Sequence, residues 1–152
     1  MSSEAPSGER LPELVCHPPG PRSRALAEEL RRLEAPRVNT WGDGSEPPLV
    51  WRRAVGSNVE DVDGNRYIDL TAGFGVAAVG HRHPRVVEAV HRQSDELLHG
   101  LADVAAHPAR IELARRLVEV APLPDAQVYF AVSGSDAVEI AIETAWLATS
   151  RP

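Results

Sequence analysis

The chain has 152 residues, of which 43% are hydrophobic and 25% charged, so it is long enough for one globular domain with a core. The formal net charge of −6 and the isoelectric point near 5.5 argue against nucleic acid or an anionic membrane as a partner. The one cysteine, Cys16, allows no intrachain disulfide, and no apolar run reaches the length of a transmembrane helix. We therefore expect a cytoplasmic protein.

All 16 basic residues are arginine, and the chain contains no lysine. Codon bias explains part of this composition. A Schiff base nevertheless needs a lysine amine. The sequence therefore excludes any mechanism in which this chain itself supplies that amine.

Residues 1–22 are rich in serine, glycine and proline, which predicts a flexible N-terminal tail or an extended arm over another surface. A short helix is predicted over residues 24–33, because its leucines recur on one face. Several prolines and glycines in residues 34–48 predict a loop.

Residues 49–70 predict a small antiparallel meander. Its expected strands and turns are residues 49–55, 58–62 and 66–70, with turns at Gly56–Ser57 and Asp63–Asn65. The acidic run at the second turn also resembles the start of a calcium loop. We reject this site because its glycine comes too early in the loop and Ala72 stands where a bidentate glutamate belongs.

The small apolar residues 71–80 contain a dinucleotide-binding pattern, since Gly73, Gly75 and Ala78 follow a predicted strand with the required spacing. The helix that this pattern needs would meet Pro84 too early, and the acidic residues at the right distance lie inside the next predicted helix. We therefore favour a close-packed loop in which glycine lets backbone pass near backbone or ligand.

His81 and His83 suggest a metal site, but no third ligand has suitable spacing, so we predict a structural turn and no metal. Pro84 fits the first turn of a helix that ends near Gly100. Another amphipathic helix is predicted before Pro122.

Residues 127–146 predict a strand, a turn and a helix. The apolar run Val128–Val132 is typical of a strand buried on both faces. A helix beginning after Ser133 would offer free backbone N–H groups, its positive dipole end and hydroxyls, which together suit a phosphate. An ordinary helix capped by Ser133 or Ser135 explains the same residues, and both interpretations stay open.

A buried parallel strand needs neighbours on both sides, and the sequence offers no further strand after Val132. We therefore expect the chain to be the front part of a larger α/β protein. An orphan strand edge of this kind is also a predicted aggregation site.

From residue 49 to about residue 148, the chain resembles the class III aminotransferases, the fold type I pyridoxal-phosphate (PLP) enzymes that include 4-aminobutyrate, ornithine and acetylornithine transaminases. The resemblance is carried by motifs in the family's order, namely Val59–Asp69, Gly73–Pro84, Val86–Gln93 and Phe130–Glu139. It implies an N-terminal portion of that fold: a small antiparallel meander, helices and the first βα unit of an incomplete parallel-sheet domain.

The resemblance also implies domains and site residues. It divides the chain into a tail (1–22), a small-domain segment (23–100) and the start of the PLP-binding domain (101–152). It places Gly134 and Ser135 on the cofactor phosphate, with Ser133 shaping the turn. The segment Phe74, Gly75 and Val76 would lie near the substrate entrance.

The family's Schiff-base lysine, the aspartate that pairs with the ring nitrogen and the aromatic residue that stacks on the ring all come later than this chain reaches. We therefore expect no catalytic residue and no activity from the chain alone. The parent enzyme would be a homodimer that moves an amino group from an amino acid or ω-amino compound to a 2-oxo acid. A truncated relic, a subunit completed by a second chain, and a non-catalytic phosphate-ligand or protein-binding module remain alternatives.

Overall fold

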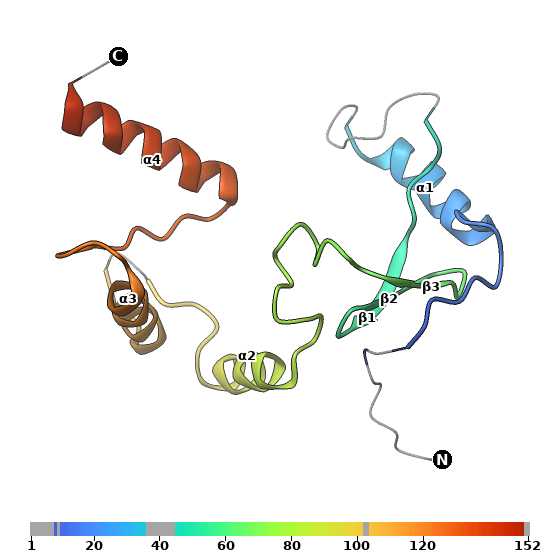
Figure 1. Cartoon of the computed structure of the whole chain (residues 1–152), viewed down its shortest axis with the longest axis horizontal. Helices are drawn as coiled ribbons and strands as arrows, with labels where there is room; N and C mark the ends of the chain where they lie inside the picture. The colour runs from blue at the N-terminus through green and yellow to red at the C-terminus, as the bar shows by residue number, and fades with distance from the viewer. Residues whose placement is uncertain (1–7, 9, 36–44, 102–103, 151–152) are drawn as a thin grey trace. The chain divides into compact units, whose positions relative to one another are not determined.

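The computed structural model describes residues 8, 10–35, 45–101 and 104–150, which belong to two compact units, Met1–Glu96 and Leu97–Pro152 (Figure 1). The first unit contains α1 (Pro21–Leu33), β1 (Trp51–Val55), β2 (Asn58–Asp61), β3 (Arg66–Ile68) and α2 (Pro84–Glu96). The second contains α3 (Pro108–Val120) and α4 (Gly134–Thr149). None of the helices in the described ranges is both long and apolar enough to cross a bilayer.

The predicted meander is confirmed. Its strands pair antiparallel in the order β1-β2-β3, with Asn58 opposite both Val55 and Ile68. Each strand is shorter than predicted by one or more residues. The hairpin between β2 and β3 turns at Gly64, whose φ of 92° suits glycine. The small core of the described residues consists of Val59 in β2 and Ala27 in α1.

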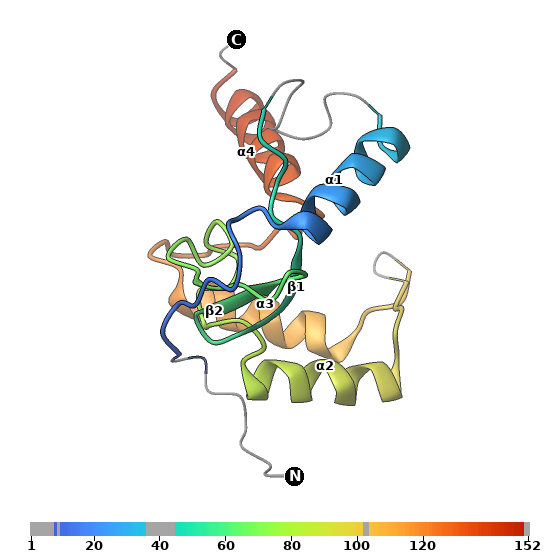
Figure 2. The same ribbon diagram turned by 90° about the vertical axis from the view of Figure 1, so that its right-hand side faces the viewer.

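Helix α1 begins at Pro21, three residues earlier than predicted, because a distant carboxylate caps it. Asp63 in the hairpin turn accepts hydrogen bonds from the Arg22 N–H at 2.8 Å and the Ser23 N–H at 2.9 Å. The Ser23 hydroxyl adds a third bond at 2.6 Å. Figure 2 shows the N-terminal turn of α1 beside the sheet. Gly20 is required there, since a Cβ would lie 2.4 Å from the Asp63 Cγ.

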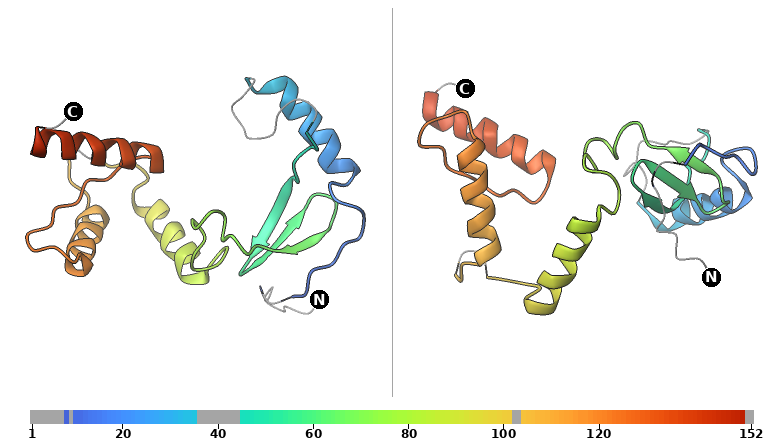
Figure 3. Two further views of the ribbon diagram at one scale, coloured as in Figure 1. Left: turned by 45° about the horizontal axis from the view of Figure 1, so that its top comes forward. Right: turned by 60° about the horizontal axis from the view of Figure 1, so that its bottom comes forward.

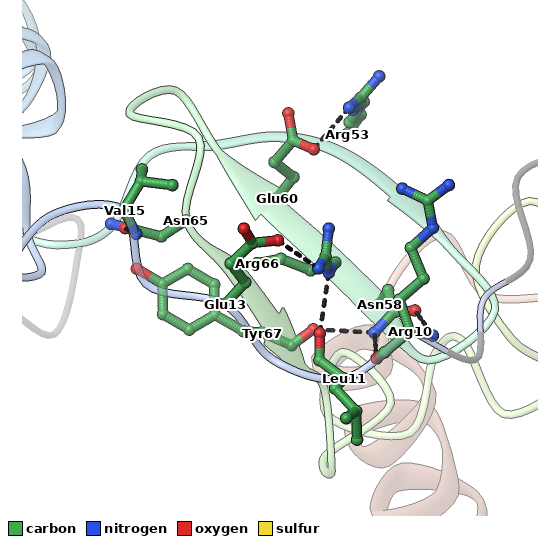
Figure 4. Close-up of polar contacts among 10 residues, drawn as sticks. All are labelled: Arg10, Leu11, Glu13, Val15, Arg53, Asn58, Glu60, Asn65, Arg66 and Tyr67. Atoms are coloured by element: carbon green, nitrogen blue, oxygen red, sulfur yellow. Dashed lines mark hydrogen bonds and ion pairs between the residues drawn. The ribbon is translucent and has the colours of Figure 1, made fainter.

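Residues 10–16 form an extended arm along the meander (Figure 4). Glu13 and Arg66 exchange two backbone hydrogen bonds at 2.9 and 2.8 Å. The Asn65 side-chain oxygen accepts bonds from the Val15 N–H at 2.8 Å and the Cys16 N–H at 3.0 Å. For residues 1–22 we predicted either a flexible tail or an extended arm. Residues 10–16 form an extended arm. Residues 1–7 and 9 lie outside the described residues.

The strand predicted at Val128–Val132 is not formed. This segment runs extended between α3 and α4, as Figure 3 shows, and pairs with no other described segment. A strand requires backbone partners alongside it, and the described part of this unit consists of helices and connections. The segment instead packs through Phe130, whose ring centroid lies 5.0 Å from the Arg110 guanidinium carbon of α3.

The remaining helices follow the predicted pattern. Helix α2 begins at Pro84 as expected but ends at Glu96, before the predicted Gly100. Helix α3 has His107 as its N-cap, and the ring nitrogen Nδ1 accepts a bond from the Ala109 N–H at 3.1 Å.

Candidate functional site

The N-terminus of α4 is capped by its own turn. The Ser133 hydroxyl oxygen accepts a hydrogen bond from the Asp136 N–H at 3.1 Å, and the Asp136 carboxylate accepts one from the Val132 N–H at 2.9 Å. These bonds hold Ser133 in an extended conformation with φ −150° and ψ 166°. The N-cap interpretation is therefore confirmed, with Ser133 as the cap.

The cap leaves two neighbouring backbone donors free. Within the described ranges, neither the Gly134 N–H nor the Ser135 N–H has a hydrogen-bond acceptor, and the exposed Ser135 hydroxyl is also unbonded. A Cβ added to Gly134 would meet no atom within 4 Å, so the space beside it is open. Donors at the positive end of a helix dipole favour an anion. Capping and phosphate binding are therefore compatible in this turn.

A shallow groove of about 610 Å³ extends from this turn along α4. Gly134 and Ser135 line one end, and Trp146 lines the other. Glu139 and Glu143 also line the groove. Because these carboxylates repel anions, the part of the groove suited to a phosphate is its first turn.

The second candidate site is the glycine-rich loop 71–80, closed at its base by Asp69. One carboxylate oxygen of Asp69 accepts from the Thr71 N–H at 3.0 Å and the Thr71 hydroxyl at 2.8 Å. The other accepts from the Gly73 N–H at 2.8 Å and from the His81 Nε2 at 2.7 Å. The hydrogen bond from His81, followed by those from Thr71, lowers the pKa of Asp69 to about 2.

The backbone of this loop turns repeatedly through the left-handed region, with φ of 49° at Ala72, 58° at Gly73 and Phe74, and 86° at Gly75. No helix begins between Gly73 and Gly80, so the dinucleotide pattern is not a strand-to-helix turn here. The segment is a loop, as we favoured, but it is not close-packed at Gly73 and Gly75, where an added Cβ would meet no atom nearer than 4.0 Å. Gly80 does pass close to backbone, since its added Cβ would lie 3.3 Å from the Gly56 Cα. Phe74 is 97% exposed and Val76 is 91% exposed, so the apolar tip faces outward.

The two histidines of the turn have different surroundings. His81 pairs with Asp69, and its ring meets Trp51 edge-on, with centroids 6.1 Å apart. His83 has a buried Nδ1 without a hydrogen-bond partner among the described residues. In those ranges no group of three or more histidine, cysteine or acidic side chains could hold a metal.

The Asp61 carboxylate is occupied within the meander. It accepts bonds from the backbone N–H groups of Asp63 and Asn65, from the Asn65 amide and from the Tyr67 hydroxyl, at 2.7 to 2.9 Å. Burial opposes ionisation of Asp61, but these bonds outweigh it and lower its pKa. Burial raises the pKa of Tyr67 to about 12, and its bond to Asp61 acts in the same direction. The carboxylate that suggested a calcium loop is thus part of the fold.

Most of the chain matches a known protein family, and its fold is similar to solved structures. The family model described as Aminotransferase class-III matches residues 41–151. The chain belongs to the class III aminotransferase family. Its structure is similar to the taurine:2-oxoglutarate aminotransferase of Bifidobacterium kashiwanohense, solved with PLP and glutamate, with a TM-score of 0.71 and 30% identity over 86% of this chain and 28% of that one. A thermostable omega transaminase mutant from Pseudomonas jessenii gives a TM-score of 0.69 at 34% identity, over 80% of this chain and 28% of that one.

Two curated relatives, a racemase and an aminotransferase, match most of this chain. The chain is 39% identical to an alanine/serine racemase of Pyrococcus horikoshii, over 93% of this chain and 29% of the relative. It is 40% identical to the 4-aminobutyrate aminotransferase of Mycobacterium tuberculosis, over 91% of this chain and 30% of that enzyme. This class III aminotransferase sequence therefore spans less than a third of these relatives' length. It forms part of the fold type I architecture, with helices and a small antiparallel sheet.

Sequence reasoning missed two polar contacts in this class III aminotransferase segment. The Asp69–His81 pair spans 12 residues, and the cap that Asp63 gives to α1 spans about 40. Local patterns carry no information about such separations. The Asp69-x-Thr71 spacing, typical of an aspartate that bonds to the backbone two residues later, was the one available signal.

Proposed function

We propose that this chain is the N-terminal segment of a PLP-dependent class III aminotransferase. The parent enzyme transfers an amino group from an amino acid or ω-amino compound to a 2-oxo acid. The observation that carries this proposal is the free donor pair of Gly134 and Ser135 at the start of α4, in a chain of this family.

The residues of this turn fit the phosphate group of PLP. The backbone N–H groups of Gly134 and Ser135 and the Ser135 hydroxyl would donate hydrogen bonds to phosphate oxygens, while Ser133 holds the turn through its bond with Asp136. When bound, PLP supplies an electron sink for reactions at the carbon that carries the amino group. The contribution of this chain is to bind and orient the cofactor through its phosphate.

The tip of the glycine-rich loop is the proposed substrate-facing part of the chain. Phe74, Gly75 and Val76 present an exposed apolar surface suited to the carbon skeleton of a substrate. The backbone reaches this tip through consecutive residues in the left-handed region, from Ala72 to Gly75.

The chain alone is proposed to be inactive. It contains no lysine to hold the cofactor covalently, and it spans less than a third of the relatives' length. We further propose that the parent is a cytoplasmic homodimer. The domain division at residues 22 and 100 is part of this proposal.

The phosphate site is tested by replacing one backbone donor. Gly134→Pro removes an N–H at the first helical position, where proline is tolerated, and the extended Ser133 suits a residue before proline. We expect the affinity of the purified chain for inorganic phosphate and for PLP to fall by about tenfold or more, the scale of one charge-assisted hydrogen bond. Isothermal titration calorimetry measures both affinities.

Gly134→Ala is the matched control, because it keeps the N–H and its Cβ meets open space. The affinities of Gly134→Ala for phosphate and PLP should stay within about twofold of those of the unsubstituted 152-residue chain, since no donor is lost. If Gly134→Pro and the unsubstituted chain bound phosphate and PLP with equal affinity, the proposed phosphate site would be contradicted. Phosphate binding without a preference for PLP would favour the alternative of a non-catalytic phosphate-ligand module. A transamination rate from the purified chain would contradict its proposed inactivity.

A further inference from the structure

We infer that Asp69 and His81 form a positioning pair that closes the glycine-rich loop at its base and fixes the direction in which Phe74 and Val76 are presented. The consequence for substrate binding rests on the proposed function. The inference about the loop rests on its geometry alone.

Both ends of the loop are anchored on the turn between β1 and β2. The Asp69 N–H donates to the Ser57 carbonyl at 2.8 Å, and His81 and Gly56 exchange two backbone bonds at 2.8 and 2.9 Å. These backbone bonds bring the two side chains to the same place. The 2.7 Å contact between His81 Nε2 and the Asp69 carboxylate then links the two ends directly.

Asp69 also controls the first turn of the loop. Its side chain is only 4% exposed and receives bonds from the Thr71 N–H, the Thr71 hydroxyl and the Gly73 N–H as well as from His81. One carboxylate oxygen is shared by Gly73 and His81. A shift of His81 therefore moves the acceptor that holds Gly73 in its left-handed conformation.

His81 is itself restrained. Because a carboxylate can only accept, the ring must carry a proton on Nε2 for this bond. The ring lies nearly perpendicular to the ring of Trp51, at an interplanar angle of 88°. A Cβ at Gly73 would lie 4.0 Å from the His81 Cε1, so the ring also borders the turn that it helps to hold.

Among the residues that the structure describes, none gives the tip of the loop comparable support. Its backbone bonds are internal, from Gly75 to Thr71 at 2.9 Å and from Ala77 to Ala72 at 2.8 Å. Phe74 and Val76 are almost fully exposed. The direction of the tip is thus set at the base, and the Asp69–His81 pair is the side-chain part of that base.

Amide hydrogen exchange on the ¹⁵N-labelled full chain tests the pair. We expect His81→Ala to speed exchange at Gly73, Gly75 and Ala77 by about tenfold, since a bond to a charged acceptor is lost. His81→Gln should restore slow exchange to within about threefold, because its amide nitrogen can donate from a similar position. Exchange at Val59 in β2 should stay unchanged in both variants.

His91→Ala is the control, since His91 lies exposed on α2 in the same unit and should leave the loop unchanged. Unchanged loop exchange in His81→Ala would overturn the inference. Failure of His81→Gln to restore slow exchange would also overturn it. Faster exchange at Val59 together with the loop would overturn it as well, because the pair would then support the unit as a whole. None of these measurements needs a cofactor, so an unchanged phosphate affinity in Gly134→Pro would reject the proposed phosphate site and leave this test intact.

Discussion

The Asn65 side chain links the N-terminal arm to the meander. It is fully buried and lies beside Val15 of the N-terminal arm (Figure 4). It accepts hydrogen bonds from the backbone of Val15 and Cys16 and donates one to Asp61 at 2.9 Å. A buried polar group that loses its partners costs free energy because water cannot replace them. Asn65 therefore adds to the backbone pairing of Glu13 with Arg66 in holding the arm on the meander.

Asn65→Ala should lower the free energy of unfolding by about 2–4 kcal/mol, because two backbone N–H groups lose their acceptor and the Asp61 carboxylate loses one of its four hydrogen-bond donors. Urea unfolding followed by circular dichroism measures the loss. Arg53→Ala is the control, since it removes an exposed ion pair with Glu60 that contributes less than about 1 kcal/mol. Equal losses in the two variants would show that Asn65 has no special role.

Acid should destabilise the first unit in a defined pH range. The pKa of Asp69 falls from 3.8 to about 2 on folding, with His81 as the main cause, and Asp61 and Asp63 shift in the same direction. A carboxylate with a depressed pKa in the folded state stabilises the fold above its unfolded pKa, and this stabilisation is lost as the pH falls through the folded value. Stability should therefore fall between about pH 4 and pH 2.

The thermal midpoint measured across this pH range checks the sign. Asp69→Asn should give a shallower dependence, because one of the linked groups no longer titrates. Asp95→Asn, which removes an exposed carboxylate of α2, should keep the slope of the parent chain. An identical slope in all three proteins would contradict the role of Asp69.

At the scale of elements, α1 depends on a cap from the hairpin. Its own N-cap residue, Gly20, has no side chain, and Asp63 supplies the acceptor. Asp63→Ala should therefore fray the first turn of α1 and cost about 1 kcal/mol. Faster amide exchange at Arg22 and Ser23 would report the fraying.

Glu28→Ala provides the control for this cap, because it removes an exposed pair with Arg31 on the same helix. Exchange in the first turn should then be unchanged. If Asp63→Ala also left exchange at Arg22 and Ser23 unchanged, the carboxylate would not be the cap that stabilises the helix.

The elements also show which structural information is local in the sequence. Apolar periodicity and the Asp-Gly turn predicted the meander and the helices, because these features depend on near neighbours. The predicted start of α1 was wrong because the carboxylate that caps this helix lies 40 residues away in the sequence. The prediction of a strand at Val128–Val132 was wrong, because a strand needs backbone partners and no described segment pairs with these residues. At the candidate site, the Ser133 cap was predictable from its turn, whereas the Asp69–His81 pair was not.

The two units differ in how much they bury. The hydrophobic side chains buried in the described residues, Ala27 and Val59, both lie in the first unit. Helices α3 and α4 contain no buried residue. Since the hydrophobic effect is the main source of stability, the second unit should be the weaker one.

Amide exchange across the whole chain should therefore be faster in α3 and α4 than in β2, under conditions where the first unit stays folded. The β2 amides of the same sample are the internal control. Protection in α4 equal to that in β2 would contradict the expected order. The exposed side chains of α4, among them Val138, Ile142 and Trp146, should also bind a hydrophobic dye.

The cap from Asp63 has a consequence for biosynthesis. Residues Arg22 and Ser23 are translated about 40 residues before the carboxylate that holds them. At the usual rate of about 5–20 residues per second, the helix waits for roughly 2–8 seconds before its acceptor is even synthesised. During that interval its first turn has no cap, so the hairpin must form before α1 reaches its full length. A ribosome pause between codons 24 and 62 would lengthen the interval in which this end of the nascent chain is open to proteases.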